Sequence, residues 1–143
     1  MPLSCSTFPA SRLCIVSGES TVTRSDIDAY LARTIASGAK GYAKLVDITG
    51  CTLALDADDI EAVADRLMHY GMGEQPGPVA MVVGSALNLD MAVLLKQRVG
   101  DRPFRIFTSV GAARSWLAGY QQSYDPAAFT TGLSTQWRSL RTI

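Results

Sequence analysis

The stretch TLALDADD, residues 52–59, places acidic side chains directly after a short apolar run. Asp56 and Asp58 have the Asp-x-Asp spacing that a Mg²⁺-dependent phosphohydrolase could use, with one carboxylate as nucleophile and the other as acid and base. Such a reaction also needs a cation on the transferring phosphoryl group and further carboxylates to hold Mg²⁺. The rest of the chain therefore decides whether these acids do chemistry.

The later part of the chain does not supply the missing groups. No lysine follows Lys96, and the later carboxylates Asp101 and Asp125 are not paired. The alternative is that these acids begin a helix. Asp56 would cap the helix and Asp59 would follow three residues later, and negative charge is favourable at a helix N-terminus. We favour this structural interpretation for Asp56, Asp58 and Asp59.

Other catalytic or metal-binding constellations have no support in the sequence. The single histidine, His69, cannot build a metal cluster and falls near a predicted helix end, where a cation is favoured. Neither a G-x-S-x-G elbow nor a glycine-rich phosphate loop occurs. Cys5, Cys14 and Cys51 are odd in number and widely spaced, which indicates neither a disulfide framework nor a zinc site. We expect no cofactor and no metal.

Composition and charge restrict the class of protein and of partner. Hydrophobic residues make up 48% of the 143-residue chain and charged residues 18%, a balance typical of a folded globular protein. Thirteen basic and thirteen acidic residues cancel, and no basic stripe is available for a nucleic acid. No apolar run is long enough for a membrane span, and residues 1–10 lack the features of a signal peptide. We expect a cytoplasmic protein that does not bind nucleic acid.

Short apolar runs alternate with amphipathic patterns along the chain, which predicts an α/β fold. The runs at 12–18, 42–48, 79–84 and 104–107 predict strands, and a strand at 3–8 could pair with the first of them. Helices are predicted after Thr23 as far as Gly38, after Asp56 as far as Tyr70, after Ser85 as far as Gly100, and at 109–119. Right-handed crossovers then give a mainly parallel sheet of four to five strands with about four helices. We expect one domain, 1–119, and a tail, 120–143, that docks on the domain or on an oligomer partner through anchors such as Trp137.

The spacing of apolar residues predicts which face of each helix is buried. The first helix is expected to bury Ile27, Tyr30, Leu31, Thr34 and Ile35; the second Ile60, Val63, Ala64, Leu67 and Met68; the third Leu87, Met91, Leu94, Leu95 and Val99; the fourth Val110, Ala113, Trp116 and Leu117.

Polar residues and a glycine follow three of the predicted strands. Ligands of open α/β sheets favour the crevice beyond the carboxyl ends of the strands. The binding candidates at this edge are Asp47 and Thr49, then Gly84 and Ser85, then Thr108 and Ser109. Ser85 and Ser109 also precede helices, where capping is the structural alternative to binding an anion or a partner's backbone.

The segment VDITGCTLALDADDIEAV, together with KLVDITG, VAMVVG and FRIFTSVGAARSWL, resembles STAS domains and, more closely, the SpoIIAA-like family of small bacterial proteins. The likeness covers residues 12–118 and implies the fold more than an activity. In antagonists of this kind a serine at the start of the helix accepts phosphate, and DADD stands there instead. Asp58 could hold that position in a permanently negative state, and Asp56 and Asp58 are therefore partner-binding candidates.

These observations predict a non-enzymatic regulatory module that binds a protein partner and forms a homodimer. Because the related CRAL-TRIO folds enclose apolar molecules, a carrier of a small apolar ligand is the alternative. A Mg²⁺-dependent phosphohydrolase is the third candidate function. For a carrier, the methionines that could line the pocket are Met68, Met72, Met81 and Met91.

Overall fold

A computed structural model describes residues 2–38, 41–70, 77–99 and 103–124 of the chain. Its centre is a five-stranded sheet in the order β1-β2-β4-β6-β7. The strands of this sheet are β1 (Leu3–Phe8), β2 (Leu13–Gly18), β4 (Ala43–Asp47), β6 (Val79–Val82) and β7 (Phe104–Phe107). β1 runs antiparallel to β2, and the remaining neighbours are parallel. The predicted α/β class, the mainly parallel sheet and the pairing of the first two strands are confirmed.

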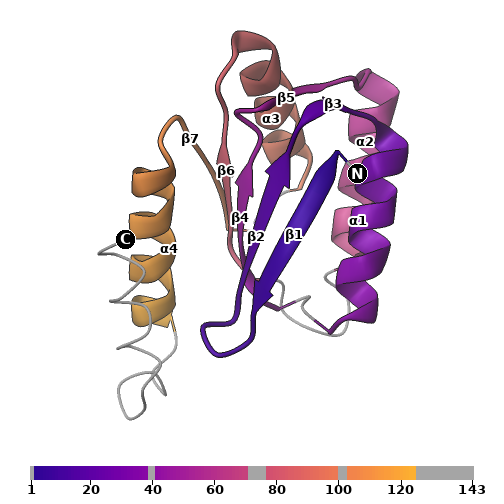
Figure 1. Ribbon diagram of the computed structural model, residues 1–143. Helices are drawn as coiled ribbons and strands as arrows, with labels where there is room; N and C mark the ends of the chain where they lie inside the picture. The colour runs from indigo at the N-terminus through magenta and orange to yellow at the C-terminus, as the bar shows by residue number, and fades with distance from the viewer. Residues whose placement is uncertain (1, 39–40, 71–76, 100–102, 125–143) are drawn as a thin grey trace.

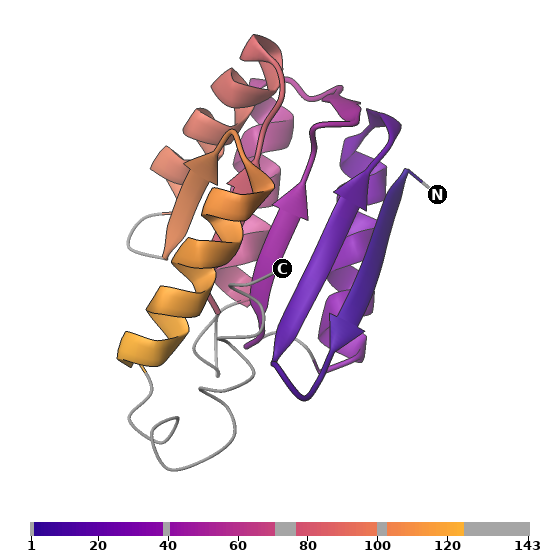
Figure 2. The same ribbon diagram turned by 60° about the vertical axis from the view of Figure 1, so that its left-hand side comes forward.

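Four helices cover the two faces of the sheet unequally (Figures 1 and 2). They are α1 (Arg24–Ala36), α2 (Ala57–Tyr70), α3 (Ala86–Arg98) and α4 (Val110–Tyr124). From β2 the chain continues to β4, then β6, then β7, and each new strand is added on the same side of the previous one. Right-handed connections therefore place the intervening helices α1, α2 and α3 on the same face of the sheet. α4 follows the last of these strands and packs on the opposite face.

The alternation of side chains along each strand divides the core into two clusters. On β6, Val79 and Met81 point toward the three-helix layer, whereas Ala80 and Val82 pack with Ala113 and other residues of the α4 side. All four residues of β6 are buried, as expected for a central parallel strand covered on both faces.

α1 begins with a complete capping box, as the sequence predicts. The Thr23 side chain accepts a hydrogen bond from the Asp26 amide, and the Asp26 carboxylate accepts from the Thr23 backbone N–H at 2.8 Å and from its hydroxyl at 2.9 Å. These two bonds hold the pKa of Asp26 below its ordinary value. The helix ends at Ala36 with Ser37 as its C-cap, and Gly38 follows in the left-handed region with a φ of +75°.

This cap makes the stability of the protein depend on acid pH. A carboxyl group whose pKa is lowered by folding stabilises the protein above its unfolded pKa of about 4, and that contribution is lost as the pH falls through the folded pKa. Asp26→Asn should therefore lower the urea midpoint at pH 7 and leave it unchanged near pH 2. Glu19→Gln, at an exposed position between β2 and Ser20, is the control and should have no effect at either pH. If the urea midpoint of Asp26→Asn stays below that of the wild type near pH 2, the carboxylate is not what stabilises the cap. Thr23→Ala, which removes the other half of the cap, should lower the free energy of unfolding by about 1 kcal/mol at pH 7.

Several predicted buried faces and boundaries are wrong. Ile35 of α1 is exposed, and so are Leu87 and Leu94 of α3. The buried side of α3 consists of Asn88, Ala92, Leu95 and the C-cap Val99. The buried stripe thus starts one residue later than predicted, at a polar side chain that apolar periodicity cannot detect.

The last helix and two short strands also differ from the prediction. α4 continues to Tyr124, past the predicted helix end at 119, because nothing in residues 120–124 breaks a helix. The remaining tail, including Trp137, lies outside the described residues, as do Met72 and Gly100. β3 (Ser20–Val22) and β5 (Cys51–Leu53) form a separate parallel pair, and neither strand was predicted from the sequence. Strands of three residues are too short to show a periodicity.

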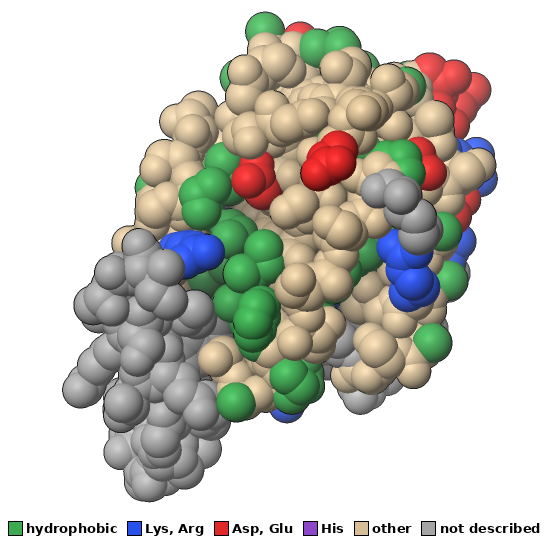
Figure 3. Space-filling model, in the orientation of Figure 1, with side chains coloured by type: hydrophobic (Ala, Val, Ile, Leu, Met, Phe, Trp, Pro, Cys, Tyr) green, Lys and Arg blue, Asp and Glu red, His purple; other side chains and the backbone are tan. Residues whose placement is uncertain are grey.

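α4 leaves the β1–β2 side of its sheet face uncovered by any described helix. Figure 3 shows apolar side chains gathered on this face between α4 and the β1–β2 hairpin. Ile15 of β2 and Trp116 of α4 are only partly buried here, and Phe8, at the end of β1, is exposed. The larger, enclosed core therefore lies on the other face, beneath α1, α2 and α3.

Candidate functional site

The predicted site residues at the carboxyl edge of the sheet form a set of tight turns and caps. After β4, the Asp47 carboxylate accepts hydrogen bonds from the Thr49 backbone N–H at 3.0 Å and from its hydroxyl at 2.7 Å. After β6, the backbone of Gly84 lies against Thr49. A side chain at residue 84 would place its Cβ atom 3.3 Å from the Thr49 Cα. The structure thus brings Asp47, Thr49 and Gly84 together.

Ser85 and Ser109 both act as helix caps. The Ser85 hydroxyl accepts from the Asn88 amide at 3.1 Å at the start of α3, and the Ser109 hydroxyl accepts from the Ala112 amide at 3.3 Å at the start of α4. Thr108 and Ser109 are exposed at the end of β7. Capping accounts for the contacts that both serines make.

Asp56 and Asp58 lie at the beginning of α2, where the sequence places them. Asp56 accepts from the Asp59 amide at 2.8 Å, and Asp59 accepts from the Asp56 amide at 3.1 Å, which forms a reciprocal cap. Asp59 also lies 3.9 Å from the Arg24 guanidinium of α1, and Asp58 is exposed in the first turn. Within the described part of the chain, no three His, Cys, Asp or Glu side chains are placed to hold a metal ion together.

Two cysteines are buried, Cys51 beside this edge and Cys14 near the start of β2, and the surroundings of both disfavour the thiolate form. Burial raises the pKa of the Cys51 thiol, and the Asp47 carboxylate raises it further. Burial likewise raises the pKa of Cys14, with Cys5 contributing in the same direction and Lys44 opposing it. A neutral thiol is a poor nucleophile, so the sites of Cys14 and Cys51 are not suited to nucleophilic catalysis.

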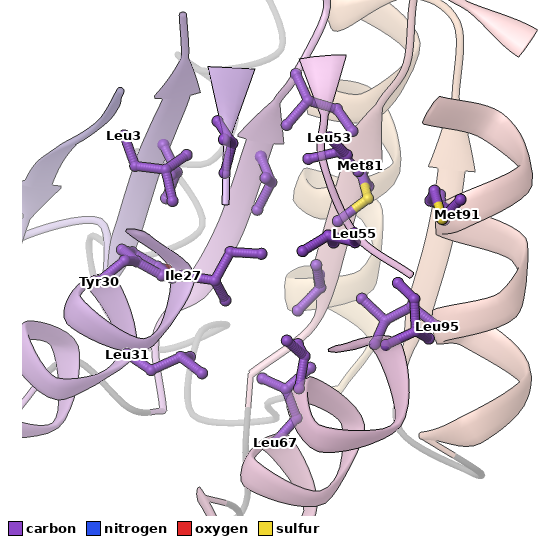
Figure 4. Close-up of a pocket in the computed structure, with 18 of the residues that line it drawn as sticks. Leu3, Ile27, Tyr30, Leu31, Leu53, Leu55, Leu67, Met81, Met91 and Leu95 are labelled. Carbon is purple, nitrogen blue, oxygen red and sulfur yellow. The ribbon is translucent and has the colours of Figure 1, made fainter. Parts of the chain in front are cut away.

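The feature with the capacity to bind a molecule is a cavity between the sheet and the three-helix layer (Figure 4). Its volume is about 110 Å³. The main sheet supplies Leu3, Val16, Lys44, Val46, Val79, Met81 and Phe104; α1 supplies Ile27, Tyr30 and Leu31; α2 supplies Ile60, Val63 and Leu67; α3 supplies Met91, Ala92 and Leu95; and Val22, Ile48, Leu53 and Leu55 complete the lining.

The lining is apolar apart from Tyr30 and Lys44. Lys44 is only 4% exposed, and its Nζ donates a hydrogen bond to the Tyr42 carbonyl at 2.9 Å. In the sequence, Lys44 is visible only as the exception in an apolar run. Neither residue was predicted as a site residue, because a cavity depends on how three helices meet the sheet and leaves no local pattern in the sequence.

Of the four methionines named for a carrier's pocket, two line this cavity. Met81 points from β6 and Met91 from α3 toward the cavity, as Figure 4 shows. Met72 and the Met68 side chain lie outside the described part of the structure. Methionine adapts its shape to irregular spaces, so the two observed residues suit a pocket whose contents vary.

Asn88 supports this cavity from the α3 side. Its side chain accepts from the Leu53 amide at 3.1 Å and donates to the carbonyls of Ile48, at 3.1 Å, and Cys51, at 2.8 Å. These bonds tie the segment from Ile48 to Leu53 to the start of α3. Ile48 and Leu53 themselves line the cavity. The sequence carries no motif that distinguishes this asparagine from a surface residue.

Two further observations concern the kind of protein this chain is. No helix in the described residues is long and apolar enough to cross a membrane. No family model matches the chain, and neither the curated proteins nor the solved structures contain a significant match to it.

Proposed function

We propose that this protein binds a small apolar ligand in the cavity between its sheet and helices α1, α2 and α3. The observation that carries the proposal is the apolar lining of a cavity of about 110 Å³. Native cores contain few voids larger than a water molecule, and an unfilled apolar void of this size costs roughly 2–3 kcal/mol at about 24 cal/mol per Å³. A bound apolar molecule would recover that free energy.

The proposal predicts saturable binding of a neutral apolar probe. Benzene, which a somewhat larger apolar cavity accepts, should bind in a one-to-one ratio by titration calorimetry and should raise the melting temperature with its concentration. Ala92→Leu extends a buried lining residue into the cavity and should weaken the binding at least about tenfold. Ala112→Leu makes the same change at an exposed position of α4 and should leave the affinity unchanged. Equal binding by wild type and Ala92→Leu would refute the proposal, as would no saturable binding to wild type.

The same substitutions test the cavity through stability. Ala92→Leu should be neutral or stabilising, because the added carbons fill empty space. Ala118→Leu adds the same carbons to the closed core beneath α4, where Ala118 has no exposed surface, and should cost about 1–3 kcal/mol. If both variants lose the same free energy of unfolding in urea, the cavity is not available space.

Protein recognition, the role predicted first from the sequence, is a second proposal. The observation that favours it is the outward face of α3, where Leu87, Leu89, Val93 and Leu94 are between 38% and 48% exposed. A second copy of this chain fits that face. If two α3 helices pack antiparallel with Val93 at the twofold axis, Asp90 lies opposite Lys96 of the partner subunit, so opposite charges meet.

The dimer has its own test. Sedimentation equilibrium should show a reversible dimer that Val93→Glu converts to a monomer. Ile35→Glu, at an even more exposed apolar position on α1, should leave the dimer intact. A wild-type protein that is monomeric at all concentrations would exclude this occupant of the α3 face.

A relationship to STAS or SpoIIAA-like proteins is likewise a proposal. What supports it is the order of elements: an apolar strand ends at Asp47, a short second strand follows, and α2 begins at DADD, residues 56–59. Asp58 is exposed at the place where such a relationship would put a phosphoacceptor, so its role as a constant negative charge in partner recognition remains a prediction.

A further inference from the structure

Two thiols and a hydroxyl form a cluster on the hairpin of β1 and β2. The Thr7 hydroxyl oxygen lies 3.9 Å from the Cys5 sulfur and 4.0 Å from the Cys14 sulfur. Cys5 and Thr7 belong to β1, and Cys14 belongs to β2. None of the three residues lines the cavity beneath the helices, so the cluster is independent of the proposed function.

The register of the hairpin turns both sulfurs to the same face of the sheet. Thr7 is directly opposite Cys14, and Cys5 is opposite Val16, two residues further along β2. Side chains two residues apart on a strand share a face, so Cys5 and Cys14 are diagonal neighbours. The Cys5 thiol lies close enough to Cys14 to act on it through electrostatics and a hydrogen bond, and both effects raise the pKa of Cys14.

The spacing of this pair suits an ion between the sulfurs better than a direct bond. Diagonal neighbours on antiparallel strands have Cα atoms roughly 7–8 Å apart, whereas disulfides usually join Cα atoms no more than about 6.8 Å apart. A disulfide would therefore require the strands to move. Because metal–sulfur bonds are about 2.3 Å long in zinc sites, an ion bonded to both sulfurs spans roughly 4.6 Å and needs no such movement.

The number and type of the ligands select the class of ion. Thiolate sulfur prefers soft ions such as Cu(I), whereas Mg²⁺ and Ca²⁺ require oxygen ligands. Structural zinc takes four ligands, and across the described residues no third His, Cys, Asp or Glu side chain joins the two sulfurs. Two thiolates with one monovalent ion carry a net negative charge, and the positive charge of Lys44, opposite Cys14 on β4, favours the Cys14 thiolate. A soft monovalent ion fits this set.

The two sulfurs differ in exposure, which gives the ion a path of entry. β1 is the outermost strand of the sheet, as Figure 2 shows, and Cys5 is exposed on it. Cys14 is 0% exposed, so an ion reaches its sulfur by way of Cys5. Burial keeps the free Cys14 thiol protonated, and binding of the ion must displace that proton.

We propose that Cys5 and Cys14 bind one soft monovalent metal ion of the Cu(I) class, held between their two sulfurs beside the Thr7 hydroxyl. The spacing of the cysteines in the sequence does not indicate this site, because the hairpin brings together residues nine positions apart. The structural alternative is that the thiols only fill space as small apolar side chains.

An anaerobic titration with Cu(I), in competition with a chromogenic Cu(I) chelator, tests the site. The wild-type protein should bind one ion per chain, and Cys5→Ser and Cys14→Ala should each weaken the binding at least about tenfold. Cys51→Ala removes a buried thiol outside the cluster and should preserve the affinity. Equal affinity of the wild type and Cys5→Ser would overturn the proposal, as would a wild-type protein that takes no Cu(I) from the chelator.

Measurements on the wild-type protein keep the test decisive even if Cys14→Ala does not fold. X-ray absorption at the copper edge should show two sulfur neighbours, and native mass spectrometry should show one ion for each chain. A single sulfur neighbour would refute the site. One ion shared by two chains would also refute it, because the exposed Cys5 of each chain would then be the ligand.

Discussion

Asn88→Ala is expected to lower the free energy of unfolding by about 3–5 kcal/mol, the largest effect that we anticipate for a single side chain. The amide is 1% exposed and serves the Leu53 N–H and the carbonyls of Ile48 and Cys51. Each buried group that loses its partner costs about 1–3 kcal/mol. Because a domain of this size has roughly 5–15 kcal/mol in total, the variant should lose a large share of the stability of the protein. Urea denaturation followed by circular dichroism measures the loss.

Asn88→Asp and Ser85→Ala divide this effect into its parts. The aspartate keeps an acceptor for the Leu53 amide, but it cannot donate to the two carbonyls and brings a negative charge into a buried site. It should therefore be nearly as destabilising as the alanine. Ser85→Ala removes only the helix cap and should cost about 1 kcal/mol. A loss below about 1.5 kcal/mol for Asn88→Ala would mean that water replaces the amide, and the tie between α3 and β5 would be secondary.

Gly77→Ala should be the second severe substitution. A Cβ atom at residue 77 would lie 2.7 Å from the Gly41 carbonyl oxygen and would also overlap the carbonyl group of Tyr42. These are backbone atoms just before β4, so they cannot rotate away as a flexible side chain can. We expect a loss of about 2–4 kcal/mol, since the start of β4 must shift relative to the segment that leads into β6.

Gly119→Ala provides the matched control. Residue 119 lies inside α4, and a Cβ atom there would meet nothing within 4 Å. Alanine is the better helix former by about 0.5–1 kcal/mol, so this variant should be more stable than the wild type. Thermal unfolding of both variants under the same conditions gives the comparison. A Gly77→Ala protein with wild-type stability would show that the contact between residues 77 and 41–42 is loose in solution.

The fold was predictable from the sequence wherever a repeating pattern carried the information. The apolar run at β6 and the capping pairs at Thr23 and Asp56 each predicted an element correctly, because apolar alternation and capping chemistry act over a few residues. The chain order of strands and helices then left few topologies, given right-handed crossovers.

The prediction failed where a distant partner decides the outcome. On α3 the apolar positions outnumber the buried ones, so periodicity chose Leu87 and Leu94 for the inner face. The structure instead buries Asn88, whose partners are 35 to 40 residues earlier in the chain. The choice of face is made by hydrogen bonds to the β5 segment, and those contacts are not encoded in the local spacing.

The candidate site was predictable only in part for the same reason. Asp47, Thr49 and Gly84 come together because parallel strands end at a common edge, which the topology alone implies. The cavity and its lysine were not predicted. A buried lysine in a strand has the same sequence signature as an exposed one, and the difference arises only when α1, α2 and α3 cover the strand.

The unequal filling of the two sheet faces should also govern how the molecule responds to hydrostatic pressure. Unfolding releases the void beneath the three helices, and the volume decrease scales with the void that is eliminated, within a usual range of some tens of millilitres per mole. The core beneath α4 is rich in alanine, and none of its residues lines that void. Compression should therefore act first on the face that carries α1, α2 and α3, while the α4 face keeps its packing. A molecule occupying the cavity would make the whole protein less compressible.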